Sequence, residues 1–270
     1  MRPLIAALAL MLAACSQGEP SASAEEVARA QPSPVERCMN LGGALEAPNE
    51  GDWGYTVRQA DLVRLKEAGF DTVRLPVKWS AHADERAPYT IDPNFMDRVD
   101  EIVTDATEAG LNIIVDVHHY NALMKKPDAH RARLGAIWTQ IADHFEGAPD
   151  SVIFELINEP NDRMTVRKTD AINRELLAIV RAKHPDRWVV VGSAGWGGLD
   201  ALLKSRPPED DRIILTFHSY EPYDFTHQGA SFSDDPPPVG MRWGSNEDRE
   251  LMEMGANMAA TFANQQGYPI

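Results

Sequence analysis

Short apolar runs alternate along the chain with longer stretches of mixed apolar and polar residues, from Arg37 onward. Six of these runs predict strands: residues 38–41, 72–77, 112–117, 152–157, 188–191 and 213–217. Near-continuous apolar runs suit strands that are buried on both faces, as in a parallel sheet covered by helices. Periodicity alone leaves short buried helices as the alternative, and the first run carries the weakest signal.

The stretches between these runs show the spacing of amphipathic helices. Residues 60–68 and 95–109 each place their apolar side chains on one face, and Gly69 and Gly110 follow where helices commonly end. Repeated strand–helix units predict an α/β fold, either an open doubly wound sheet or a TIM barrel of eight units.

Polar side chains gather where the predicted strands end, and this favours the barrel. The residues concerned are Asn40, Glu46, Arg74, His118, His119, Asn158, Glu159, His218 and Tyr220. In a barrel the carboxyl ends of the strands surround one mouth, whereas an open sheet spreads them along a line. The sequence therefore predicts a single site built from residues that are distant along the chain.

The fourth strand stops at an amide, a carboxylate and a proline, Asn158-Glu159-Pro160. A glutamate at the rim of an apolar barrel is partly desolvated, which raises its pKa and suits it to act as a general acid. We therefore expect a raised pKa for Glu159, and Asn158 beside it could hydrogen-bond a sugar hydroxyl. A solvated loop glutamate is the alternative.

His118 and His119 follow Asp116 and raise the question of a metal site. Neighbouring residues on a strand point to opposite faces, so the pair is poorly placed to chelate one ion. We therefore expect no metal and interpret His118 as a neutral hydrogen-bonding partner. Arg74 either positions a catalytic carboxylate and lowers its pKa, or forms a structural ion pair.

Composition and charge narrow the possible partners. The chain has 270 residues, 43% of them hydrophobic, and a net charge of 26 − 41 = −15, which disfavours nucleic acid and anionic membranes and suits a neutral ligand. Exposed aromatic residues could stack on sugar rings. The candidates are Trp53, Trp79, Tyr120, Trp196, Tyr223, Phe232 and Trp243, whereas Trp138 and Trp188 are expected to pack in the core.

The first residues have the features of a targeting signal. Residues 1–14 combine Arg2, a short apolar run and small residues directly before Cys15, a pattern typical of a bacterial lipoprotein signal with lipidation at Cys15. A plain secretory signal is the alternative, and either predicts export. Residues 15–36 predict a flexible tether and residues 37–270 the folded domain, in which Cys38 is expected to be buried and inert.

Five motifs in order resemble glycoside hydrolase family 5, the large cellulase family. They are Asn40-Leu41-Gly42-Gly43-Ala44-Leu45-Glu46, Val73-Arg74-Leu75-Pro76, Asp116-Val117-His118-His119, Asn158-Glu159-Pro160 and His218-Ser219-Tyr220. The resemblance implies a (β/α)8 barrel, a β-linked glucan or mannan as substrate, and a retaining mechanism with two carboxylates and no metal or other cofactor.

The resemblance also implies a role for each matching residue. Glu159 would be the acid/base, while Arg74 and Tyr220 would orient the nucleophile. His118, Asn158 and His218 match other active-site positions, and Glu46, His119 and His227 match sugar contacts. Gly43 and Phe232 depart from the Asn and Trp that are common in the nearest relatives, which puts the nearby sugar contacts in doubt.

The nucleophile of the family is a glutamate at the end of the seventh strand. In this sequence the last residues, Gly267-Tyr268-Pro269-Ile270, match only the start of that strand. We therefore expect a partial barrel of about six strands that is inactive on glucans and poorly soluble. Glu221 is a weak substitute, because a loop position offers no fixed attack geometry. The alternatives are a non-catalytic glycan-binding surface lipoprotein and a metal-dependent barrel hydrolase.

Overall fold

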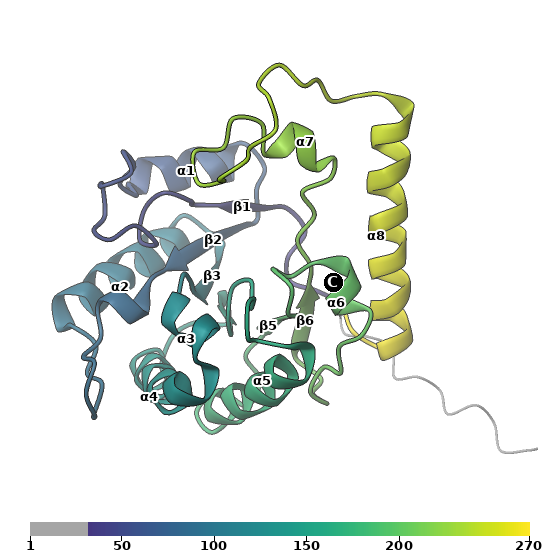
Figure 1. The fold of residues 1–270 in the computed structure, drawn as a ribbon. Coiled ribbons are helices and arrows are strands. Elements are labelled where there is room, and N and C mark those ends of the chain that lie inside the picture. The colour runs from purple at the N-terminus through teal and green to yellow at the C-terminus, as the bar shows by residue number, and fades with distance from the viewer. Residues whose placement is uncertain (1–31) are drawn as a thin grey trace, which may run out of the picture.

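The computed structural model describes residues 32–270, and in them six strands form one parallel sheet in chain order (Figure 1). The strands are β1 (Cys38–Asn40), β2 (Thr72–Val77), β3 (Asn112–Val117), β4 (Val152–Glu155), β5 (Val189–Gly192) and β6 (Ile213–Thr216). Each matches one of the six predicted runs, so the prediction of parallel strands is confirmed.

Helices connect consecutive strands, as the right-handed crossover of a parallel sheet requires. Between the strands lie α1 (Gln59–Glu67), α2 (Pro93–Glu108), α3 (Asn121–Lys125), α4 (Pro127–His144), α5 (Val166–Arg181) and α6 (Leu199–Leu202), with a short 3-10 helix at Trp79–Ala81. Two further helices, α7 (Tyr223–Thr226) and α8 (Asn246–Gln266), follow β6. Gly69 and Gly110 follow α1 and α2 with φ angles of 85° and 74°. Both predicted helix ends are therefore confirmed.

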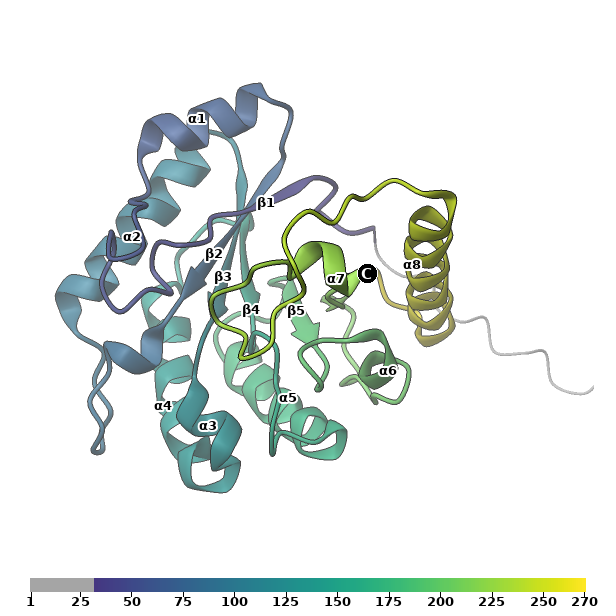
Figure 2. The same cartoon turned by 45° about the horizontal axis from the view of Figure 1, so that its top comes forward.

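Alternate residues of each strand face two different surroundings. One face of the sheet packs under the helices, and we call it the outer face; Figure 2 shows α2, α4 and α5 along it. Its buried residues include Val73, Leu75, Ile113, Val115, Phe154, Val191 and Ile213. The opposite, inner face has a smaller apolar cluster of Ile114, Ile153, Trp188, Val190 and Ile214.

The sheet is open within the described residues, because β1 and β6 are its two edges. The backbone N–H of Leu215 in β6 donates to the carbonyl of Pro269 at 2.8 Å, so the last residues run beside that edge. Six parallel strands with this order form part of a barrel wall. The prediction of an incomplete TIM barrel is confirmed in these residues.

The predicted roles of three side chains are corrected by their burial. Trp79 and Tyr120 are 0% and 2% exposed, so neither ring is free to stack on a sugar. The indole N–H of Trp79 instead donates to the carbonyl of Asp116 at 3.1 Å. Cys38 is exposed, because it lies on the open edge strand, and its predicted burial is wrong. Trp138 and Trp188 are buried, as predicted.

The predicted signal segment, Cys15 and most of the predicted tether lie outside the described residues. The final tether residues are ordered against the sheet: the Pro34 carbonyl accepts a hydrogen bond from the Asn112 side chain at 3.0 Å, and Val35 packs on the inner apolar cluster. Residues just before the predicted boundary at Arg37 therefore contact the sheet. Among the described helices, none combines the length and apolar character needed to cross a bilayer.

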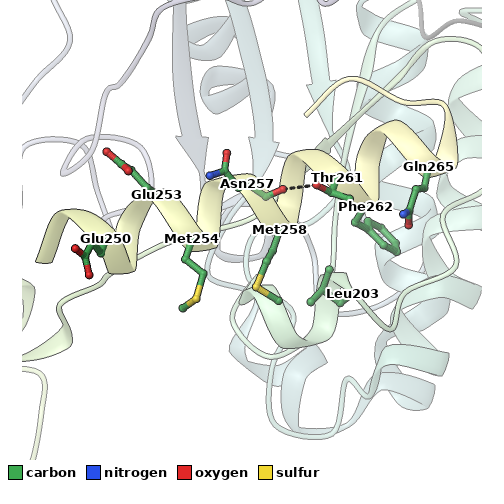
Figure 3. A pocket seen from close by; sticks show the side chains of 9 residues that line it. All are labelled: Leu203, Glu250, Glu253, Met254, Asn257, Met258, Thr261, Phe262 and Gln265. Carbon is green, nitrogen blue, oxygen red and sulfur yellow. Dashed lines mark hydrogen bonds between the residues drawn. The ribbon is translucent and has the colours of Figure 1, made fainter. Parts of the chain in front are cut away.

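Helix α8 is poorly covered compared with the other long helices. It begins with a capping box between Ser245 and Asp248, yet its buried residues are only Ala259 and Ala263. A cavity of about 740 Å³ is lined by residues of α8 together with Leu203, which follows α6. Figure 3 shows Met258 on the side of α8 that faces Leu203. This cavity lacks the strand-end polar groups and is not the candidate site.

Candidate active site

The polar residues that follow the strands line one cavity of about 560 Å³ on the inner face of the sheet, which we call the central cavity. Its polar lining comprises Asn40, Arg74, His118, His119, Glu155, Asn158, Glu159, Thr216, His218 and Tyr220. Ile114, Val190 and Ile214 form part of its apolar floor. The predicted convergence of distant residues is thus present in the structure.

Arg74 is the centre of a buried charge cluster. Its Nε and Nη2 donate to the two carboxylate oxygens of Glu155, each at 2.7 Å, and Nη2 lies 2.6 Å from Oδ2 of Asp116. Desolvation alone would lower the pKa of Arg74, but the carboxylates of Glu155 and Asp116 raise it above its ordinary value. Arg74 therefore stays charged and cross-links three adjacent strands.

The same guanidinium orients two amide side chains. Arg74 Nη2 donates to Oδ1 of Asn158 at 2.8 Å, and Nη1 donates to Oδ1 of Asn40 at 2.9 Å. Arg74 thus forms a buried ion pair, and its role in positioning a catalytic carboxylate stays a prediction. Its partner Glu155 was missed by sequence reasoning, although a charged residue inside an apolar strand is itself a signal of a paired buried group.

His118 and His119 lie side by side, contrary to the prediction that they point to opposite faces. Their ring centroids are 4.5 Å apart. The alternation fails because β3 ends at Val117 and His119 adopts a left-handed φ of 48°. His118 Nδ1 lies 2.7 Å from Oδ2 of Asp116. Among the described residues, no three His, Cys, Asp or Glu side chains are grouped so that they could hold a metal ion.

Glu159 is held by two partners from the segment after β6. Its Oε1 lies 2.6 Å from Nδ1 of His218 and accepts a hydrogen bond from the Tyr220 hydroxyl at 2.9 Å. Burial would raise the pKa of Glu159, but the hydrogen bonds from His218 and Tyr220 outweigh it and lower the pKa below its ordinary value. The prediction of a raised pKa is therefore wrong for this arrangement.

Tyr220 remains a hydrogen-bond donor over the physiological range. Burial, and then the negative charge of Glu159, raise the pKa of Tyr220 to about 12. The phenol therefore keeps its proton and donates a hydrogen bond to the carboxylate. This pairing fixes Glu159, whose backbone also has a left-handed φ of 44°.

Of the three residues predicted to contact sugar, only His119 lines the central cavity. Glu46 is buried, and its oxygens accept from the backbone N–H groups of Gly43 and Ala44, so it closes a loop and does not line the central cavity. His227 stacks on Tyr223 with centroids 4.0 Å apart, beside the cavity. His119 lines it. Their contacts with sugar stay predictions.

All five remaining aromatic candidates are exposed. The exposed rings are Trp53, Trp196, Tyr223, Phe232 and Trp243. Trp53 meets the His119 ring edge-on at 6.1 Å. Glu221 does not line the central cavity, and it instead accepts from the backbone N–H of Tyr223.

A parallel barrel wall with acid–base groups at the carboxyl ends of its strands is typical of α/β-barrel enzymes. The chain belongs to the cellulase family, glycosyl hydrolase family 5, whose model matches residues 36–270. This finding confirms the family indicated by the five sequence motifs.

Known relatives of the chain are endoglucanases. It is 32% identical to Endoglucanase H of Acetivibrio thermocellus over 231 residues, which cover 86% of this chain and 25% of that protein. It is 35% identical to Endoglucanase B of Ruminococcus albus over 214 residues, covering 69% of this chain and 52% of that protein. The chain thus spans between a quarter and about half of these curated relatives.

Solved structures of Thermotoga maritima Cel5A superpose closely on the chain. The complex with cellobiose has 38% sequence identity and a TM-score of 0.85, covering 88% of this chain and 78% of that one. The complex with mannotriose has 37% identity and the same TM-score and coverage. The family likeness therefore extends to the fold that positions the central cavity.

Proposed function

We propose that the chain carries the acid/base part of a retaining glycoside hydrolase site for β-linked glucans or mannans. The observation that supports this most directly is the position of Glu159, whose carboxylate lies in the central cavity with two fixed hydrogen-bond partners. The complexes of the T. maritima relative with cellobiose and mannotriose support both glycan classes as candidates.

In the proposed reaction Glu159 gives its proton to the glycosidic oxygen as the bond to the anomeric carbon breaks. A second carboxylate, about 5 to 5.5 Å away, forms the covalent glycosyl-enzyme intermediate. Glu159 then removes a proton from the water that hydrolyses this intermediate. The first step needs a protonated Glu159, so we propose that Tyr220 turns its hydroxyl to the nucleophile, which removes one cause of the lowered pKa.

We further propose that the 270-residue chain does not complete this reaction by itself. Glu155 lines the central cavity, but both of its oxygens are engaged by Arg74. Glu221 lies outside the cavity lining. No other glutamate or aspartate among the described residues lines the central cavity with Glu159. The resemblance assigns the nucleophile to a seventh strand.

The test compares the chain with a chimera that continues it with the C-terminal part of T. maritima Cel5A. Release of reducing sugar from carboxymethylcellulose is measured for both, and for Glu159→Gln in the chimera. We expect turnover only in the chimera, and a drop of at least about 100-fold with Glu159→Gln, because general acid–base catalysis contributes about 10² to 10⁴ in rate.

Clear hydrolysis by the 270-residue chain would overturn the proposed inactivity. A chimera that binds cello-oligosaccharides equally well with and without Glu159→Gln, and never turns them over, would instead favour the glycan-binding lipoprotein. Loss of chimera activity on chelation would favour the metal-dependent hydrolase.

We also propose export with a lipid anchor at Cys15, supported by the small residues that precede it and the apolar run before them. Mass spectrometry of the protein expressed with its first residues would show a diacylglyceryl mass on Cys15. A Cys15→Ala variant would lack that mass, and an unmodified Cys15 in the mature protein would contradict the anchor.

A further inference from the structure

Tyr220 reaches Glu159 from a part of the chain without regular secondary structure. It lies beyond the end of β6 and is 48% exposed. The other partner of the carboxylate, His218, is anchored through its backbone, because its N–H donates to the carbonyl of Gly197 at 2.9 Å. A different contact must therefore keep the Tyr220 hydroxyl at 2.9 Å from Glu159.

The Thr226 hydroxyl, at the end of α7, is the contact that holds Tyr220. Thr226 Oγ1 donates to the Tyr220 carbonyl at 2.6 Å. Among the described residues, this is the only hydrogen bond to the backbone of Tyr220. The same oxygen lies 3.2 Å and 3.5 Å from the carbonyls of Tyr223 and Pro222. A hydroxyl has one proton, so the shortest of the three contacts is the hydrogen bond that it donates.

His227 fixes the direction of that hydroxyl. Its Nδ1 lies 2.9 Å from Oγ1 of Thr226. Since the hydroxyl proton points to the Tyr220 carbonyl, the oxygen accepts from His227, and Nδ1 carries the donated proton. The His227 ring also meets the Tyr220 ring edge-on, with centroids 5.2 Å apart. His227 thus contacts both the hydroxyl that holds Tyr220 and the Tyr220 ring itself.

Helix α7 is tied to the loop that follows it by contacts that do not involve the Thr226 side chain. The Gln228 side chain donates to the carbonyls of Phe225 at 2.9 Å and Met241 at 3.3 Å. It also accepts from the backbone N–H of Gly240 at 2.8 Å. A variant that lacks only the Thr226 hydroxyl should therefore keep α7 in place.

We propose that Thr226 is a positioning residue for the acid/base: its hydroxyl holds the Tyr220 backbone so that the phenol stays on the Glu159 carboxylate. Thr226 does not line the central cavity and acts only through Tyr220. Without this hydroxyl the exposed phenol can leave the carboxylate, and His218 is the partner that remains. The inference rests on the proposed function, because it takes Glu159 to be the acid/base.

The experiment measures the pKa of Glu159 by carbon NMR titration of the glutamate carboxyls in the 270-residue chain. Thr226→Val keeps the shape of the side chain and removes the hydroxyl, whereas Thr226→Ser keeps the hydroxyl. Thr261→Val is the matched control, because the exposed Thr261 hydroxyl also donates to a carbonyl, that of Asn257 at 2.7 Å, but on α8. Thr226→Val is also combined with Tyr220→Phe, which lacks the phenol hydroxyl.

We expect Thr226→Val to raise the pKa of Glu159 toward its ordinary value of 4.5, because the carboxylate loses the Tyr220 hydrogen bond that helps to lower it. Thr226→Ser and Thr261→Val should leave that pKa unchanged. In the Tyr220→Phe background, Thr226→Val should cause no further change, since two residues that act through one contact are not additive.

An unchanged pKa of Glu159 in Thr226→Val would overturn the proposal. So would an equal rise in Thr226→Ser, which would assign the effect to the methyl group. An equal rise in the Tyr220→Phe background would also overturn it, because the effect would then not pass through the phenol. The proposed function fails separately: an active chimera whose turnover survives Glu159→Gln would remove the acid/base role, whatever the titration shows.

Discussion

The outer and inner faces of the sheet are built from the same strands, yet they differ in almost every physical respect. On β3, Ile113 and Val115 point outward into the main core, while Ile114 and Asp116 point inward. The outer face is apolar along its whole length. The inner face is apolar at Ile114, Ile153, Val190 and Ile214. It carries charge at Asp116 and Glu155, which are paired neighbours in the sheet.

The two faces contribute to stability in different ways. The outer face buries apolar surface against helices, which is the main favourable contribution to folding. The inner face instead buries Arg74, Asp116 and Glu155, whose desolvation is offset only while all three are present. The residues that arrange the site are therefore the ones whose loss the fold tolerates least.

The largest expected effect comes from breaking the inner charge cluster. Arg74→Met leaves Glu155 and Asp116 buried without a counter-charge, and it should lower the free energy of unfolding by about 4 kcal/mol. Urea unfolding followed by circular dichroism measures this change. Arg131→Met, which breaks the exposed ion pair with Glu175, is the control and should cost about 1 kcal/mol or less. Equal losses of unfolding free energy in the two variants would show that breaking the buried cluster costs no more than breaking an exposed ion pair.

A matched pair on β3 sharpens the comparison between the faces. Ile113→Ala, on the outer face, should lower the free energy of unfolding by about 3 kcal/mol, because the surrounding core cannot collapse into the space. Ile114→Ala, on the inner face beside the central cavity, should cost about 2 kcal/mol or less. Urea unfolding of both variants gives the difference. A larger loss at Ile114 would contradict the view that the outer face dominates stability.

The smallest expected effect concerns the protonation of Glu159. Tyr220→Phe removes one donor to the carboxylate, so the pKa of Glu159 should rise toward its ordinary value of 4.5. A carboxylate with a lowered pKa stabilises the fold above about pH 4.5, and this contribution disappears as the pH falls through the lowered value. Carbon NMR titration of the glutamate carboxyls measures the shift.

The stability difference between Tyr220→Phe and the unaltered chain should accordingly be present at neutral pH and vanish in acid. Tyr223→Phe is a suitable control, because no described hydrogen bond links its hydroxyl to Glu159. An unchanged pKa of Glu159 in Tyr220→Phe would mean that His218 alone holds the carboxylate ionised.

Much of the fold followed from local patterns. Each predicted strand is present, with its ends shifted by at most two residues, and glycine follows α1 and α2 where the sequence indicated. The motifs also located the convergence of polar residues. These features depend on neighbouring residues, which is why they can be recognised without knowledge of distant contacts.

Several properties of the site could not be predicted in this way. The expected burial of Cys38, the exposure of Trp79 and Tyr120, and the opposed faces of His118 and His119 all failed, because each depends on what packs against the residue or on where a strand ends. Glu155 was missed as a partner of Arg74, since the two lie 81 positions apart.

The sequence by itself determined the strand–helix order and the family, because apolar periodicity and short motifs are local properties of the chain. Only the tertiary structure decided the charge of the site. Burial alone would have raised the pKa of Glu159, but the fold brings His218 and Tyr220 from beyond β6 to its carboxylate, and their hydrogen bonds lower its pKa. The balance between desolvation and hydrogen bonding depends on distances across the barrel, which the linear order of residues does not contain.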